Sequence, residues 1–194
     1  MTDAIPTEAL GRARDFMRRA EAEYAQYDRT AAQLLRPIRA RVDRYPNRNL
    51  RPGLITSLVR NWHTLLPQHF RLRLAVTRPK PTRLEIIEIR VAPTTLRNDN
   101  WLNEDGETNL GVVNTVVALG MKGQRFLSQS VTHLFSRHAL ARRYQRCTEW
   151  DDAAVLRDIA CLMAVQSDKK LDHAPCTIAT ERGEWRWDAS GHDR

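Results

Sequence analysis

The segment 136–146, Ser-Arg-His-Ala-Leu-Ala-Arg-Arg-Tyr-Gln-Arg, carries the side chains best suited to chemistry. His138, Arg142 and Arg146 are four residues apart, so in a helix capped by Ser136 they share one face. Nearby arginines and the helix N-terminus disfavour the imidazolium form, so we expect a neutral His138 that accepts a proton. Metal-free RNA cleavage requires such a base beside guanidinium groups: the base takes the 2′-hydroxyl proton, and the arginines stabilise charge on the phosphate.

The order of elements around this segment resembles the core of metal-independent ribonuclease toxins of the barnase, EndoU, colicin and RelE type. A strand precedes the helical motif Ser-x-His-Ala-x-x-x-Arg, and an Asp-initiated helix and a short β-hairpin follow, over about sixty residues from Ser128 to Trp187. The resemblance implies a catalytic role for His138 and phosphate contacts from Arg142 and Arg146. His133, in the preceding strand, is the next histidine in reach and our candidate for a second acid–base group.

Positive charge is concentrated in two stretches that contain no Asp or Glu. Residues 44–84 hold nine cations and residues 108–148 hold six, whereas residues 147–194 carry ten acids against six bases. Acid-free stretches leave cations without neighbouring carboxylates and create a field that attracts phosphate. Only four of the 31 cations are lysine, and the planar guanidinium fork matches phosphate oxygens and guanine edges, which favours nucleic acid over a membrane. We predict RNA rather than DNA as the partner. The predicted nucleic-acid contacts are Arg71, Arg73, Arg125, Arg137, Arg143 and Arg146.

The hydrophobic pattern predicts an α+β fold in which N-terminal helices pack on a small, mainly antiparallel sheet, followed by two short helices and a terminal hairpin. Apolar residues recur at helical spacing over 7–44, with a bend expected at Pro37, and again over 52–66. A polar, turn-rich stretch, 93–109, is predicted to be a loop. The other predicted elements are a hairpin over Phe70–Val91, strands over Leu110–Leu119 and Arg125–Phe135, a helix over Arg137–Arg146, a helix capped by Thr148 with Asp151, and a hairpin of Thr177–Thr180 with Glu184–Trp187.

The length of 194 residues predicts a single domain, with a helical part over 1–67 and an α+β part over 68–194. No apolar run is long enough for a membrane span and no signal peptide is recognisable, so we expect a cytoplasmic protein or one delivered into a target cell. The three cysteines have the spacing of neither a disulfide framework nor a metal knuckle, and we expect reduced thiols and no cofactor.

Three other functions fit parts of the sequence. If Phe126–Phe135 is helical, it forms a helix-turn-helix with Ser136–Arg146 as the recognition helix. A metal-dependent nuclease would need clustered carboxylates, for which Glu85, Glu88, Asp99, Asp105 and Glu107 are the candidates. A host-interaction protein without catalysis could use Trp150, Trp185 and Trp187 as its surface. A toxin would in addition need an acidic inhibitor protein to cover its basic face in the cell that makes it.

Overall fold

The structure is a computed structural model. It describes residues 4–46, 48–66, 73–75, 84–96, 108–120, 123, 125–146, 151–168, 176–180 and 183–187.

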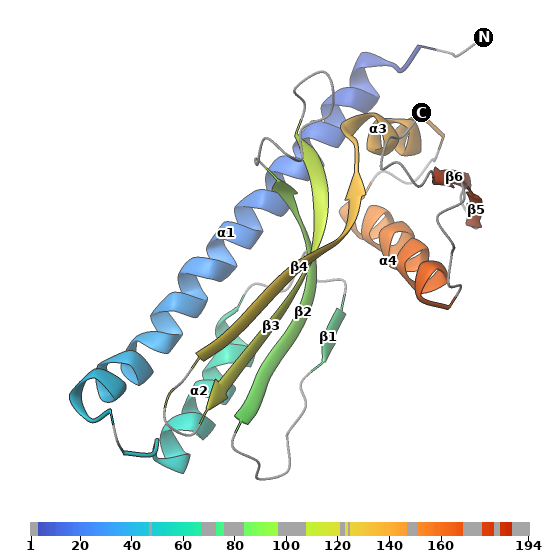
Figure 1. Ribbon diagram of the computed structural model, residues 1–194. Coiled ribbons are helices and arrows are strands. Elements are labelled where there is room, and N and C mark those ends of the chain that lie inside the picture. The colour runs from blue at the N-terminus through green and yellow to red at the C-terminus, as the bar shows by residue number, and fades with distance from the viewer. Residues whose placement is uncertain are drawn as a thin grey trace. The chain divides into compact units, whose positions relative to one another are not determined.

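The chain begins its described structure with one long helix, α1 (Thr7–Arg44; Figure 1). Most of its buried positions recur every three or four residues and form one stripe along the helix, as expected of an amphipathic helix. Pro37 lies inside the helix and is exposed. The predicted single helix is therefore confirmed, whereas the bend at Pro37 stays a prediction.

A four-stranded sheet holds the strands in their chain order: β1 (Arg73–Ala75), β2 (Leu84–Leu96), β3 (Asn109–Gly120) and β4 (Arg125–Phe135). β1 and β2 are antiparallel, with Leu74 opposite Arg90, which confirms the predicted hairpin. The long helix packs on the antiparallel sheet. β3 lies between β2 and β4 and is buried along most of its length, as its β-branched run predicts.

The predicted loop over 93–109 is wrong at both ends. β2 continues to Leu96 and β3 begins at Asn109. Pro93 and Thr94 are buried in the continuing strand, so packing overrides the turn tendency of this polar stretch. Residues 97–107 lie outside the described part of the chain.

The chain divides into two compact units, and α1 and the three long strands run through both. Unit 1 comprises Met1–Glu21, Pro93–Val112 and Val131–Arg194, and unit 2 comprises Ala22–Ala92 and Val113–Ser130. The predicted single domain stays a prediction, and each unit has its own buried residues.

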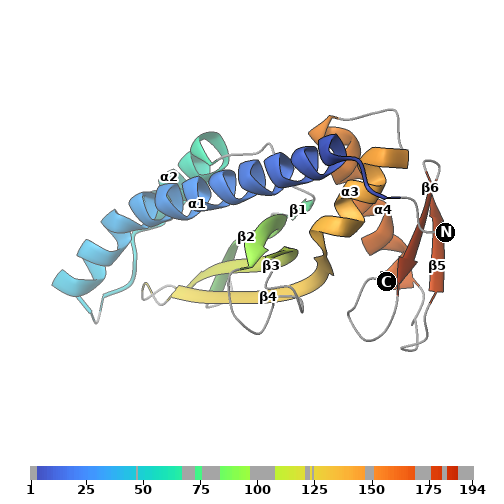
Figure 2. The same cartoon turned by 90° about the horizontal axis from the view of Figure 1, so that it is seen from above.

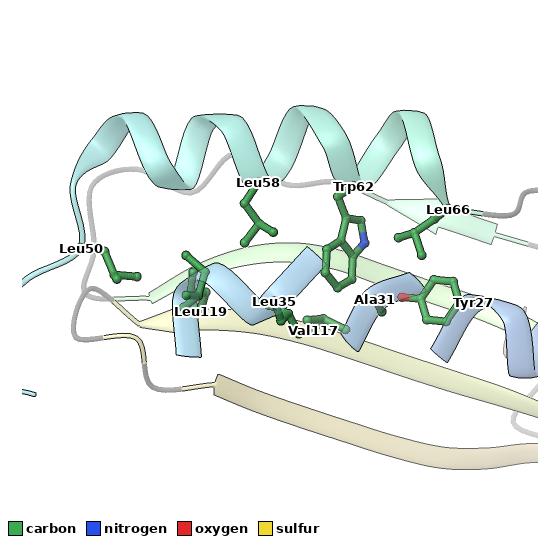
Figure 3. Close-up of a cluster of buried hydrophobic side chains, with 10 residues drawn as sticks. Tyr27, Ala31, Leu35, Leu50, Leu58, Trp62, Leu66, Val117 and Leu119 are labelled. Atoms are coloured by element: carbon green, nitrogen blue, oxygen red, sulfur yellow. The ribbon is translucent and has the colours of Figure 1, made fainter. Parts of the chain in front are cut away.

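Unit 2 is built around aromatic residues between α1 and α2 (Pro52–Leu65), the second predicted helix (Figure 3). The rings of Tyr27 and Trp62 meet edge to face, with centroids 6.4 Å apart. The strand β3 adds Val117 and Leu119 to the same cluster. At the end of β3, Gly123 N donates a hydrogen bond to Gly120 O (2.8 Å) with φ at 77°, a conformation that favours glycine.

Unit 1 contains the predicted pair of helices, α3 (Arg137–Arg146) and α4 (Asp152–Asp168), and the terminal hairpin of β5 (Cys176–Thr180) and β6 (Gly183–Trp187; Figure 2). Ser136 caps α3 as predicted: its Oγ accepts a hydrogen bond from Ala139 N (3.0 Å). The cap of α4 is Asp151, whose Oδ1 accepts from Ala154 N, and Thr148, the other half of the predicted capping box, lies outside the described residues.

Candidate nucleic-acid interface

The solvent-facing side of α3 carries the three residues that the sequence predicts to act on RNA. His138 and Arg146 are exposed and Arg142 is half-buried, whereas Leu140 and Tyr144 are buried on the opposite side of the helix. The guanidinium of Arg142 donates from Nη1 to the side-chain oxygen of Gln145 at 2.9 Å. The helical spacing therefore places His138, Arg142 and Arg146 on one solvent-facing stripe, as the sequence predicts.

Positive charge also gathers at the beginning of α3. Arg137 is half-buried; burial lowers its pKa, and the like charge of exposed Arg14 on α1 lowers it further. The first turn of α3 has no acidic residue, and the helix N-terminus adds its own partial positive charge. A phosphate near His138 would consequently meet attraction from several directions.

The structure corrects the prediction for Arg143. Its side chain is 2 % exposed, and its Nε donates to Asp158 Oδ2 at 2.9 Å, with that carboxylate 7 % exposed. One residue along a helix turns the side chain by about 100°, so Arg143 points into unit 1 although its neighbour Arg142 faces outward. Arg143 is therefore a structural residue that joins α3 to α4, and it is removed from the predicted phosphate contacts.

His133 does not share the exposed face. It lies near the end of β4, is half-buried, and has both ring nitrogens shielded from solvent. A strand position that alternates toward the interior explains this burial. The structure therefore gives His133 no solvent-facing nitrogen with which to act beside His138.

The remaining predicted contacts fall on the sheet. Arg73 lies in β1 and Arg125 begins β4, and only their backbone belongs to the described part of the structure. Arg71 lies outside the described residues. Their role as a basic strand face stays a prediction.

The helix-turn-helix prediction is wrong, because Arg125–Phe135 is the strand β4 and supplies no first helix. Within the described ranges no group of three or more His, Cys, Asp or Glu could hold a metal ion. The side chains of the five carboxylates predicted for a metal-dependent nuclease lie outside those ranges, as do those of the three tryptophans predicted for a host-interaction surface. Both of these functions stay predictions.

A second basic surface, absent from the predicted residues, lies where α1 ends. Three arginines surround the ring of Tyr45: Arg41, Arg44 and Arg48. The sequence signal that could have found it is Arg-x-x-Arg-Tyr-x-x-Arg, an aromatic residue spaced within a basic run.

Comparison of the chain with protein-family models, curated proteins and solved structures finds no match. Among the described helices, none combines the length and the apolar character that crossing a membrane requires.

Proposed function

We propose that the protein binds nucleic acid, RNA in preference to DNA, and that the exposed face of α3 cleaves RNA without a metal ion. The observation that carries the proposal is the exposure of His138 on one stripe with Arg142 and Arg146. Arg143 takes no part in this stripe, because its side chain is buried and paired with Asp158. RNA is favoured because its 2′-hydroxyl is the nucleophile that such a site can activate.

In the proposed reaction, the imidazole of His138 takes the proton of the 2′-hydroxyl. The 2′ oxygen attacks the adjacent phosphorus, and the bond from phosphorus to the 5′ oxygen breaks. The guanidinium groups of Arg142 and Arg146 stabilise the negative charge on the phosphate during this exchange. The leaving 5′ oxygen takes a proton from water or from the protonated His138, and a cyclic 2′,3′-phosphate remains.

The same charge pattern supports the accompanying proposals on partners and location. An exposed basic face that cleaves RNA would damage the cell that makes it, so we propose an acidic inhibitor protein that covers α3. The site of action is the cytoplasm, either of the producing cell or of a cell into which the protein is delivered, because RNA is abundant there.

The test is incubation of the purified protein with labelled transfer and ribosomal RNA in the presence of EDTA. The expected result is cleavage that leaves cyclic phosphate or 3′-phosphate ends and that is lost in His138→Ala. Arg157→Gln is the matched control, since it removes an exposed arginine from α4 in the same unit and should leave cleavage unchanged. If the wild-type protein binds RNA but leaves it intact, the result supports the second candidate function, nucleic-acid binding without catalysis. Cleavage by His138→Ala at the wild-type rate would overturn the assignment of the base.

A further inference from the structure

We propose that the Tyr45 cluster, which consists of Arg41, Arg44, Tyr45 and Arg48, is a separate binding site for single-stranded nucleic acid. The choice of ligand rests on the proposed function, but the site lies in unit 2, whereas the α3 face belongs to unit 1. It supplies binding and no chemistry.

The Tyr45 cluster places three guanidinium groups around one ring. The Cζ atoms of Arg41, Arg48 and Arg44 lie 4.2, 5.4 and 5.6 Å from the centre of the Tyr45 ring. Two backbone hydrogen bonds hold the chain around the ring: Tyr45 N donates to Arg41 O (3.0 Å), and Arg48 N donates to Tyr45 O (3.2 Å). Tyr45 is 37 % exposed, Arg44 and Arg48 are exposed, and Arg41 is half-buried, so the cluster is accessible from solvent.

The charge around the cluster is one-sided. Residues 36–60 contain seven arginines and one acid, the exposed Asp43. Within the part of the chain that the structure describes, no ion pair joins a carboxylate to Arg41, Arg44 or Arg48. Three guanidinium groups about one ring repel one another, and a bound polyanion would relieve that repulsion.

The position of the arginines favours a ligand over a purely structural role. Arg41 and Arg44 lie in the last turn of α1, where cations complement the helix dipole. Arg48 and Arg51 lie beyond the helix end and are exposed, so the helix dipole does not account for their positions. The nearby Tyr45 ring attracts each guanidinium, while the N–H groups stay available to phosphate oxygens.

The exposed aromatic ring selects single strands. Bases in a duplex stack on one another and hide their faces, whereas an unpaired base can stack on a tyrosine ring or on a guanidinium plane. A row of phosphates from the same strand then meets the surrounding arginines. RNA and single-stranded DNA share this chemistry, and both are used in the test.

The test measures binding of single-stranded RNA, single-stranded DNA and duplex DNA across a salt series, with the full chain carrying His138→Ala to prevent cleavage. Replacing Arg41, Arg44 and Arg48 together by Gln should reduce the slope of log affinity against log salt by about 2, since each phosphate contact on a single strand contributes about 0.7. Tyr45→Leu should weaken single-strand binding about tenfold, and Tyr45→Phe should keep it, because only the ring is needed for stacking. A fluorescent base analogue in the oligonucleotide reports the stacking directly.

The matched control replaces Arg18, Arg29 and Arg157 together by Gln, which removes the same charge from exposed positions elsewhere. If this control changes the salt slope less than the triple variant of the Tyr45 cluster does, the result supports the site. An equal change, unaltered binding by Tyr45→Leu, or binding confined to duplex DNA or to vesicles of anionic lipid overturns it. If the His138→Ala chain binds no nucleic acid at low salt, the proposed function fails. If replacing Arg142 and Arg146 abolishes binding and replacing the arginines of the Tyr45 cluster does not change it, only the proposal for the Tyr45 cluster is refuted.

Discussion

Among the residues that the structure describes, two arginines are buried, one in each unit, and they lie against different neighbours. In unit 1, Arg143 is ion-paired with Asp158 at 2.9 Å. In unit 2, the guanidinium of Arg90 lies 3.8 Å from the ring centre of Tyr27 and 5.0 Å from that of Tyr24. Both arginines are nearly inaccessible to solvent.

These two kinds of neighbour act on a guanidinium in different ways. A carboxylate cancels the charge but must itself be desolvated, whereas aromatic faces offer a weaker attraction that carries little desolvation cost. The solvent-facing arginines of α3 and of the Tyr45 cluster do not need such compensation, because water reaches them, even where an aromatic ring lies beside them. Arginine count alone therefore does not measure the surface available for phosphate.

The largest expected effect comes from breaking the ion pair in unit 1. Asp158→Ala leaves the charge of Arg143 buried without its carboxylate, and we expect a loss of about 3–5 kcal/mol in the free energy of unfolding. Urea unfolding measures it. Combining Arg143→Met with Asp158→Leu should recover most of that loss, because both charges are removed.

The matched control for this prediction is Asp15→Ala. Its carboxylate pairs with Arg18 at 3.0 Å on the surface of α1, with side chains 54 % and 77 % exposed. Such pairs contribute less than about 1 kcal/mol. Equal losses for Asp158→Ala and Asp15→Ala would contradict the structural role of the buried pair.

A somewhat smaller effect is expected from the aromatic partner in unit 2. Tyr27→Leu removes the ring beneath Arg90 and the edge contact with Trp62, so we expect a loss of about 2–3 kcal/mol in unfolding free energy. Thermal or urea unfolding provides the measurement. The control is Tyr45→Leu, an exposed tyrosine that also lies beside arginines and should cost less than about 1 kcal/mol. The reverse order of these two losses would refute a stabilising contact of Tyr27 with Arg90.

A third effect is a loss of unfolding free energy, on the order of 2 kcal/mol, that should appear only at high pH. Burial, followed by the nearby carboxylate of Asp152, raises the pKa of Tyr144 to about 12. An unfolded tyrosine ionises near pH 10, so the stabilisation is complete below about pH 10 and is lost as the pH rises through about 12. Tyr144→Phe should make the unfolding free energy less steep across this window. A fall as steep as in the wild type would contradict the raised pKa. Burial also raises the pKa of Tyr24, which accounts for part of the remaining slope.

The sequence predicts the fold class and nearly all elements, because their hydrophobic periods are long and regular. The stripes in α1 and α2 and the alternation around β1 predict these elements directly, whereas the β-branched run of β3 favours a strand but also fits a short helix. The extension of β2 to Leu96 was not predicted, because it depends on burial by tertiary packing, which local composition does not reveal.

The candidate site was predictable only in part. Helical spacing alone places His138, Arg142 and Arg146 on one face. The burial of Arg143 was not predictable, because its partner Asp158 comes from another helix and no local pattern joins them. The Tyr45 cluster likewise depends on how the chain turns after α1, which the spacing of its arginines suggests but does not determine.

The most direct test of the distinction between buried and exposed arginines is the salt dependence of RNA binding by the His138→Ala chain, compared with the same chain carrying Arg142→Gln and Arg146→Gln. We expect log affinity for single-stranded RNA to fall linearly with log salt, and the slope to become shallower by about 1.4 when the two arginines are replaced. Identical slopes, or no binding at low salt, would contradict the claim that the exposed arginines of α3 bind phosphate.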